Sequence, residues 1–529
     1  MSLDSSANRK PSPSSPSDME KGAYDEPAVI PVLANDVENI DEKTEGYRQM
    51  FTFQDGERLK RKADWRLLSL LALCYLLKNL DANVVSYVLT INQGTPDNIL
   101  KSLHMTKNSY SYVSTVFTAL FCLAEIPSNI TIKWATPRLH FTRILILWSI
   151  TCACTAACTN RASLYACRAL LGLFEGGLWP GVCYQLSCWY RPDEMAVRAT
   201  MLISLAQFST IIDALLTFGL SYANGHGMAG WQWSFVITGI LGLFLAVVVF
   251  FCLPDWPDSP PSRRQFLTPE EGAFMVARLP PNSSRSSDSN FDWRMIKKDL
   301  SGALLWSIAL LQMCGQVGST GLTFWLPSIL SSWGITNRQT SALLTIPTAA
   351  LYIMVSFAFG YFLDRHTRFP KPTFMIIAQV ATIGKLTSSP NADLLGFFIG
   401  MIFCRNKAGL YVLICLAYCG VAVFQTSIIP MRAMTTKGSA SAAFAYAFNN
   451  TLGNSVGLYS AQIFRSQYAP DYAIPFAVCV VFLFLSIVAI CVAWWKCKDI
   501  EIETRRVLKE RQMAAKENKV ALAELSRDL

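Results

Sequence analysis

The chain has 529 residues, of which 52% are hydrophobic and only 16% charged, and its formal net charge is +9. Soluble globular chains carry about 25% charged residues, so this composition excludes a string of soluble domains and indicates one large membrane-embedded body. The same numbers exclude collagen, coiled coils, disordered chains and disulfide scaffolds.

The positive charge does not indicate nucleic-acid binding, because no basic patch interleaved with aromatic residues occurs. Membrane proteins concentrate Lys and Arg in their cytoplasmic loops, which explains the charge without such a partner. Most of the sixteen cysteines lie inside apolar runs, and the four histidines are not neighbours. We therefore expect no nucleic-acid partner, no metal site and no cofactor, with an ion gradient as the energy source.

Residues 1–62 predict a disordered cytoplasmic tail, because they are rich in Ser, Pro and acidic residues and poor in apolar ones. No apolar core of a cleavable signal peptide is visible there. A basic cluster between Glu57 and Arg66 directly precedes the first apolar run, as is typical of a cytoplasmic flank.

Twelve apolar runs follow, each near the roughly 20 residues that a helix needs to cross a bilayer. Six of them form a first half at 63–253 and six a second half at 300–495, joined by a polar cytoplasmic hinge at 254–299. A charged cytoplasmic tail at 496–529, which we predict to be helical, ends the chain. The predicted spans are 66–90, 110–132, 141–159, 162–188, 197–222, 233–253, 301–330, 340–363, 372–388, 408–430, 440–464 and 473–495. The predicted fold is thus an all-α membrane protein of twelve transmembrane helices.

The distribution of Lys and Arg predicts that both termini are cytoplasmic. Counted with the flanking helical turns, the even-numbered loops hold 17 Lys and Arg residues and the odd-numbered loops hold 8. This asymmetry agrees with the positive-inside rule. Residues 389–407 contain an apolar run too short to span, and we interpret them as an insertion between the ninth and tenth helices; a re-entrant segment is the alternative.

Two six-helix halves joined by a hinge describe the architecture of major facilitator transporters, in which the halves rock around a mid-membrane site. Several motifs narrow this resemblance. They are Glu125-Ile-Pro-Ser-Asn129, Arg168-Ala-Leu-Leu-Gly172-Leu-Phe-Glu175-Gly176, Trp189-Tyr190-Arg191-Pro-Asp-Glu194, Gly230-Trp231-Gln-Trp233 and Gly453-Asn454-Ser-Val-Gly457.

This set resembles the fungal anion:cation symporter family, named for allantoate permease, over roughly residues 60–500. The resemblance implies the major facilitator fold, a plasma-membrane location and proton-coupled movement of small organic anions; known members carry allantoate, nicotinate, pantothenate or biotin-like acids. Members usually show Leu-Asp-Arg in the first helix, where this chain has Leu80-Asp81-Ala82. A basic residue is present nearby as Lys78.

Ionisable side chains at mid-membrane are functional candidates by default because burying a charge there is costly. Arg168 and Glu175 are seven residues apart on the fourth predicted helix, which places them on one face about 10 Å apart. That separation is too long for a salt bridge, but an anion could bind at Arg168 and a proton at Glu175. The resemblance implies the same two roles, and a purely structural pair is the alternative.

Further charged candidates lie on the first and fifth predicted helices. Lys78 and Asp81 are three residues apart and can neutralise one another, or Lys78 can replace the missing family arginine as the anion anchor. Asp81 and Asp213 are further candidates for proton coupling, and Asp213 can also serve as a partner of Lys78 or as a structural group.

The second half offers neutral polar side chains. We predict that Gln316, Asn450 and Asn454 bind polar substrate atoms, although such groups can equally bond one helix to another.

Two loop motifs are predicted gates. Asp364, Arg365 and Arg368 follow the eighth helix, where the superfamily has an ionic latch facing the cytoplasm. Glu194 and Arg198 are four residues apart and can pair, though an exposed pair of this kind contributes little.

Together these features predict a monomeric secondary active transporter that carries a small organic anion, a carboxylate, vitamin-like acid or ureide, by proton symport across a fungal membrane. An exporter of a secondary metabolite and a non-transporting nutrient sensor are the alternatives. An enzyme is not expected, because no intramembrane catalytic set occurs. No phosphate-binding Gly-x-x-x-x-Gly-Lys-Ser/Thr loop of an ATP-driven pump occurs either.

Overall fold

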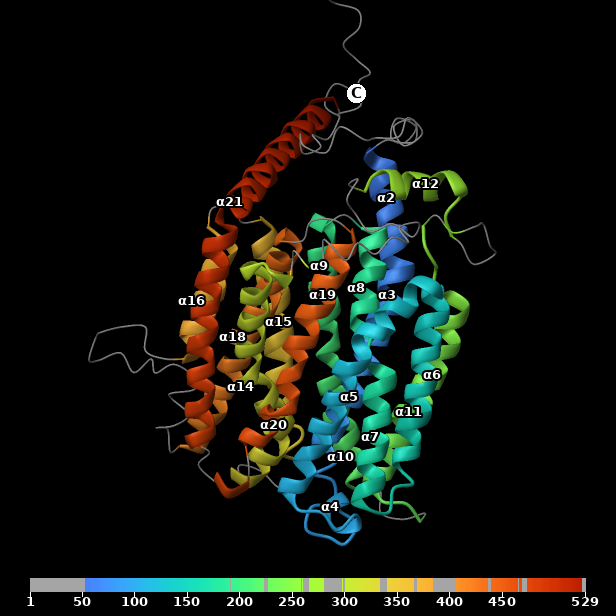
Figure 1. Ribbon diagram of the computed structural model, residues 1–529, viewed down its shortest axis with the longest axis vertical. Coiled ribbons are helices and arrows are strands. Elements are labelled where there is room, and N and C mark those ends of the chain that lie inside the picture. The colour runs from blue at the N-terminus through green and yellow to red at the C-terminus, as the bar shows by residue number, and fades with distance from the viewer. Residues whose placement is uncertain are drawn as a thin grey trace, which may run out of the picture.

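The computed structural model describes most of the predicted membrane body. The described residues are 53–190, 192–222, 227–257, 259, 266–279, 297, 300–333, 340–365, 369–383, 406–435, 439–464, 466–468 and 473–525. They form a bundle of long helices that run roughly parallel to one axis (Figure 1).

The first half is built from helices that follow the predicted spans in order. They are α2 (Phe53–Ala63), the π-helical turn η3 (Asp64–Leu68), α3 (Ser69–Tyr87), the short α4 (Ile99–Ser102), α5 (Lys107–Trp134), α6 (Pro137–Thr155), α7 (Arg161–Glu175), α8 (Leu178–Trp189), α9 (Pro192–Ala206), α10 (Phe208–Leu220) and α11 (Gly230–Cys252). Within this half, α6 packs against α11 and α5 against α7.

The second half follows a short hinge helix, α12 (Pro269–Ala277). Its elements are α14 (Ala303–Trp333), α15 (Thr345–Arg365), α16 (Lys371–Ile383), α18 (Lys407–Thr435), α19 (Ser439–Asn454), the 3₁₀ turn η4 (Ser455–Leu458), α20 (Ser460–Ile463), the 3₁₀ turn η5 (Ser466–Tyr468) and α21 (Ala473–Leu525). Here α14 packs against α21, and α18 against α15 and α16.

The all-α membrane fold is confirmed. Each of the twelve predicted spans overlaps one described helix or a run of consecutive helical segments. Among the described residues, six helices are both long and apolar enough to cross a membrane by length and composition alone. The predicted insertion at 389–407 lies outside the described residues, except for its last two positions at the start of α18.

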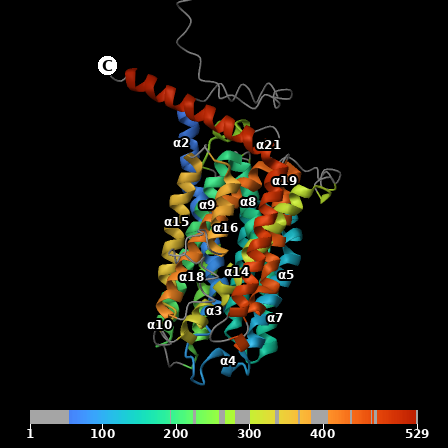
Figure 2. The same ribbon diagram turned by 90° about the vertical axis from the view of Figure 1, so that its left-hand side faces the viewer.

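The two ends of the bundle differ. At one end, which we call the α2 end, lie α2, α12 and the charged extension of α21, which projects beyond the bundle (Figure 1, and from the side in Figure 2). At the opposite end, the α4 end, lie α4 and α20 (Figure 1).

Residues 53–62, which the sequence assigned to a disordered tail, instead form α2, continuous with α3 through η3. Two causes stabilise this helix. Leu59 and Ala63 are buried, and the charged face forms ion pairs, such as Lys62 with Glu271 of α12 at 3.3 Å. The hinge likewise contains α12, which begins with a capping box between Thr268 and Glu271.

The fourth predicted span is divided into α7 and α8 at Gly176 and Gly177. Gly177 has a φ of +116°, a conformation that side chains other than glycine rarely adopt. A Cβ added at Gly172 would lie 2.3 Å from the carbonyl oxygen of Phe117, so α7 packs on α5 at backbone contact distance. The chain thus both bends and packs closely at these glycines.

The two halves contact each other along the whole bundle. Near the α4 end, Ser111 of α5 donates to Gln462 at 2.9 Å, and Tyr87 and Thr345 share a hydrogen bond of 2.6 Å. Toward the α2 end, α9 packs against α15 and α18, and α8 against α19. The halves are therefore closed on one another at both ends.

Candidate functional site

Two charged side chains of α7 are buried in the first half. Arg168 and Glu175 both lie on α7 and are 1% and 0% exposed. Since isolated charges are costly in such an environment, each requires a partner. The partners are on α3.

Glu175 pairs with Lys78. The Lys78 Nζ lies 3.4 Å from Glu175 Oε1, and 5.7 Å from the ring centroid of Phe121 on α5. The carboxylate is fully buried, whereas the Lys78 side chain keeps 19% of its surface exposed. Lys78 is thus the cation of this cluster that remains accessible.

Arg168 pairs with Asp81. The Arg168 Nη1 lies 3.7 Å from Asp81 Oδ2, and the guanidinium lies over the ring of Phe235 on α11 at 4.9 Å. Asp81 also accepts a hydrogen bond from Cys152 Sγ at 2.8 Å. Arg168 is therefore enclosed by α3, α6 and α11 inside the first half.

These pairs differ from the predicted ones. The closest ionic partner of Lys78 is Glu175, on α7, and that of Arg168 is Asp81, on α3. Each α7 charge is thus cross-paired with an α3 charge, so the four side chains form one cluster. Spacing along a single helix could not reveal this, because the partners are on another helix.

The cluster keeps unused hydrogen-bonding capacity. Both ion pairs are longer than the 2.7–2.9 Å typical of a charge-assisted hydrogen bond. Arg168 Nε and Nη2 and both oxygens of Glu175 are buried without a hydrogen-bond partner among the described residues. Such groups have unmet capacity for an additional anion or proton.

Asp213 lies on α10, 1% exposed. Both of its carboxylate oxygens lack a hydrogen-bond partner within the described part of the chain. Nearby, Asn83 donates to Ser209 at 3.0 Å. Among the described residues, the ion pair of Lys78 is with Glu175, and none joins Lys78 to Asp213.

The polar candidates of the second half lie on two neighbouring helices. Gln316 lies half-buried on α14, and Asn454 is half-buried at the end of α19. Asn450 is buried on α19 and donates through Nδ2 to Glu125 of α5. Asn450 therefore makes a contact between helices of the two halves.

Glu125 is a candidate that sequence reasoning missed as a site residue. It is 0% exposed and accepts a second hydrogen bond from Thr451 Oγ1 at 2.8 Å. A carboxylate inside the apolar run at 110–132 could have indicated this role. Glu125 was interpreted only as part of a family motif.

The predicted gate pair of Glu194 and Arg198 takes other partners. Arg198 donates to both carboxylate oxygens of Asp64, at 2.6 and 2.8 Å, and Glu194 pairs with Arg278 at 3.0 Å and Lys60 at 3.1 Å. Burial raises the pKa of Glu194, but Arg278 and Lys60 outweigh burial and hold this pKa at about 2, below its ordinary value. Arg198 Nη1 also donates to the backbone carbonyl oxygen of Glu194 at 2.9 Å. The side-chain partners belong to α2, to η3 and to the residue after α12, so spacing within α9 could not predict them.

The second predicted gate lies outside what the structure describes. Asp364 and Arg365 belong to the last turn of α15, but their side chains are not described, and Arg368 follows in the undescribed segment 366–368.

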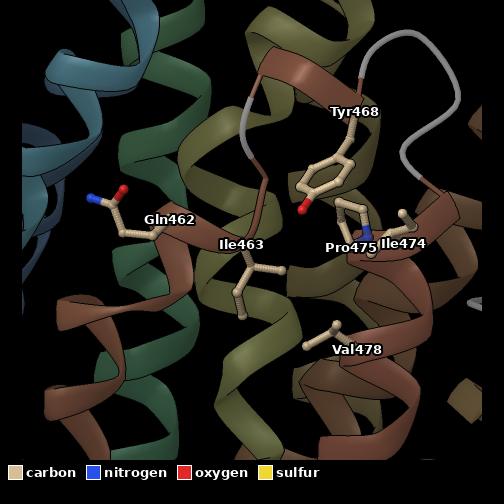
Figure 3. Close-up of a pocket in the computed structure, with 6 residues that line it drawn as sticks. All are labelled: Gln462, Ile463, Tyr468, Ile474, Pro475 and Val478. Atoms are coloured by element: carbon tan, nitrogen blue, oxygen red, sulfur yellow. The ribbon is translucent and has the colours of Figure 1, made fainter.

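A separate pocket lies at the α4 end, between α20, η5 and the start of α21. Figure 3 shows Ile463, Tyr468, Pro475 and Val478 around it, with the Gln462 side chain directed away from them. Its lining contains no charged residue, so it is distinct from the cluster on α3 and α7.

Solved structures of other proteins share this fold. The fold is shared with the E. coli xylose transporter XylE in a partially occluded inward open conformation, with a TM-score of 0.58 over 82% of this chain and 98% of that one at 13% identity. A bacterial homologue of the human lysosomal transporter Spinster gives a TM-score of 0.56 over 84% and 97% of the two chains at 14% identity.

Curated relatives are fungal. The MFS transporter prlL of Fungal sp. (strain NRRL 50135) is 28% identical over 58% of this chain and 61% of its own length, so that match spans less than two thirds of the relative. The major facilitator-type transporter hxnP of Emericella nidulans is 24% identical over 83% and 86% of the two chains. The family model for the Major Facilitator Superfamily matches residues 71–461. The chain therefore belongs to the Major Facilitator Superfamily, whose members are transporters and not enzymes.

Proposed function

We propose that this protein is a secondary active transporter that carries a small organic anion together with protons across a fungal membrane. The family and the relatives support transport, and the resemblance to anion:cation symporters suggests the substrate class. The feature that carries the proposal is the ion pair of Lys78 with Glu175, in which a buried carboxylate neutralises an accessible ammonium.

The pair provides a physical basis for symport. While Glu175 is ionised, it occupies Lys78 and competes with any substrate carboxylate. Protonation of Glu175 removes this competitor and leaves Lys78 as an unneutralised cation, which favours an anion beside it. A proton and an anion then bind more favourably together than either binds alone, which is the linkage that coupling requires.

Arg168 and Asp81 form a second ion pair between the same two helices. Their longer separation of 3.7 Å and the unpartnered Nε and Nη2 of Arg168 leave a second positive group beside the first. A guanidinium can bind a carboxylate with two parallel hydrogen bonds, so Arg168 completes the proposed anion site. Asp81 and Asp213 are further proton acceptors in this proposal.

The second half completes the site with neutral groups. Gln316, Asn450 and Asn454 are proposed to bind polar substrate atoms as the halves move. Glu194 and Arg198, with Asp364, Arg365 and Arg368 of the second half, are proposed gate residues. A monomer in the plasma membrane with both termini cytoplasmic fits this role.

The test is uptake by the purified full-length protein in liposomes. A panel of labelled carboxylates, including ureide and vitamin-like acids, is supplied with and without an inward proton gradient. Lys78→Gln is expected to abolish accumulation. Lys498→Gln, which makes the same change on the exposed extension of α21, should accumulate substrate like wild type.

Two results would contradict the proposal. One is that no carboxylate moves in wild type, in either direction. The other is that Lys78→Gln accumulates anions as well as Lys498→Gln does. Outward movement from preloaded liposomes, with no uptake, would support export instead.

A further inference from the structure

The carboxylate of Glu125 joins the two halves of the bundle near its middle. Glu125 is the nineteenth of the 28 residues of α5, in the first half, and is 0% exposed. It accepts hydrogen bonds from Asn450 Nδ2 and from Thr451 Oγ1 on α19, in the second half. Hydrogen bonds to a charged acceptor are stronger than those between neutral groups, so this bridge favours the closed arrangement of the halves.

The interface around the bridge contains a natural reporter. Cys122 lies on the same helix, and its Sγ lies 3.6 Å from the carbonyl oxygen of Thr451. When α19 moves away from α5, the Cys122 thiol loses this neighbour and becomes more accessible. Cys122 reports movement of the same two helices that Glu125 joins.

The charged neighbours of Glu125 come from α7 and α3. A Cβ on Gly176 would lie 2.9 Å from Ala124 Cβ, so the end of α7, whose last residue is Glu175, packs on this part of α5. Lys78 of α3 lies over Phe121, one turn before Glu125. The other helices packed on this part of α5 are α8 and α19, and neither contains Asp, Glu, Lys, Arg or His. The charged groups that α3 and α7 bring to this part of α5 are thus Lys78 and Glu175. The uncharged titratable groups on the packed helices are Cys183, Tyr184 and Cys188 of α8, Tyr446 of α19 and Cys122 of α5 itself.

Protonation changes what this carboxylate can do. An ionised carboxylate accepts both bonds from Asn450 and Thr451, and such charge-assisted bonds are roughly twice as strong as neutral ones. A proton taken from water onto either oxygen leaves a neutral acid with weaker acceptors. The bridge between α5 and α19 is weakened without any change in the rest of the interface.

We propose that Glu125 couples proton binding to separation of the two halves: ionised, it holds α19 against α5, and protonated, it releases α19. This role goes beyond the anion site, because it concerns contact between the halves rather than substrate binding. It needs no substrate, so it can be tested even if the anion hypothesis fails.

The experiment measures labelling of Cys122 by a water-soluble maleimide in the purified full-length protein, located by peptide mass spectrometry. At each pH the labelling rate of Glu125→Gln is divided by that of wild type. This ratio of labelling rates cancels the pH dependence of the reagent. At about pH 8 the ratio should be about tenfold, since a carboxylate hydrogen bond is lost. It should fall toward one as the pH is lowered far enough to protonate Glu125 in wild type as well.

Thr451→Val is a second variant that removes one bond with little change in shape. It should raise Cys122 labelling while keeping the pH dependence. Thr238→Val, a buried threonine bonded within α11, is the matched control and should leave labelling unchanged. Cys152, buried inside the first half, should stay unlabelled in every variant.

Two outcomes overturn the proposal. A ratio near one for both Glu125→Gln and Thr451→Val at every pH means that the bridge does not hold the halves. A raised ratio for Glu125→Gln that is constant with pH means that the bridge is static and not proton-dependent.

Discussion

Lys78 and Glu175 form a 3.4 Å ion pair between α3 and α7, in which the carboxylate is fully buried and the ammonium stays partly exposed. While Glu175 is ionised, it neutralises Lys78. When Glu175 is protonated, Lys78 loses this partner and can bind a substrate anion instead. This relationship links proton uptake to anion binding within one pair of side chains.

Replacement of Glu175 by Gln should separate exchange from accumulation. The amide is neutral, as the protonated acid is, so the substrate still reaches Lys78 but no proton accompanies it. We expect exchange of labelled for unlabelled substrate to persist within about threefold of wild type, whereas accumulation under a proton gradient is lost. Liposome exchange and uptake assays measure both. Glu503→Gln on the exposed part of α21 is the control, and accumulation by Glu175→Gln equal to that control would contradict this role.

Removal of Arg168 should destabilise the protein. Arg168→Ala leaves Asp81 buried without its cation, and breaking a buried pair in this way costs about 3–5 kcal/mol. Thermal unfolding in detergent should show a lower midpoint. The double variant Asp81→Asn with Arg168→Gln should recover part of the loss, because no unpaired charge remains. A double variant no more stable than Arg168→Ala would show that the pair is not the cause.

Close packing of α5 on α7 predicts a sharp contrast between two glycines. An added Cβ at Gly172 would lie 2.3 Å from the Phe117 carbonyl oxygen, whereas one at Gly219 of α10 meets nothing within 4 Å. Gly172→Ala should lower the unfolding midpoint because the helices must move apart. Gly219→Ala should be neutral or stabilising by up to about 1 kcal/mol, from helix propensity. Equal midpoints for the two variants would contradict this packing.

The ion pairs of Glu194 predict how stability depends on pH. The pKa of Glu194 is held at about 2 in the folded protein, below its ordinary value of 4.5, by Arg278 and Lys60 against the effect of burial. Because the folded pKa is depressed, the stabilisation is fully present above 4.5 and is lost as the pH falls from 4.5 through about 2.

Glu194→Gln should therefore lower the unfolding midpoint near neutral pH, by about 1–3 kcal/mol of stability. The difference from wild type should be constant between about pH 5 and pH 8, since Glu194 does not titrate there. Thermal unfolding at several pH values checks this. A difference that shrinks between pH 8 and pH 5 would mean that the carboxylate titrates near neutrality.

Much of the fold follows from the sequence, because apolar runs of spanning length directly locate transmembrane helices. The start of the first helix did not follow, since α2 depends on burial of Leu59 and on partners in α9 and α12. Without knowledge of those partners, a charged amphipathic segment of this kind cannot be distinguished from a disordered tail.

The residues of the candidate site could be predicted from the sequence, but the ion pairs between them could not. Lys78, Asp81, Arg168 and Glu175 stand out as charges inside apolar runs, and the structure gathers them into one cluster. Their cross-pairing depends on how α3 lies against α7, which residue spacing within either helix does not encode. Glu125 stood out equally, but its partners are some 325 residues away in the chain.

Proton-driven accumulation of an organic anion tests the central claim most directly. Wild type, Lys78→Gln and Lys498→Gln are reconstituted in liposomes and given a panel of labelled carboxylates under an inward proton gradient. The account predicts that wild type and Lys498→Gln concentrate at least one acid, that a protonophore abolishes this, and that Lys78→Gln does not concentrate it. Accumulation that survives the protonophore, or that is undiminished in Lys78→Gln, would contradict it.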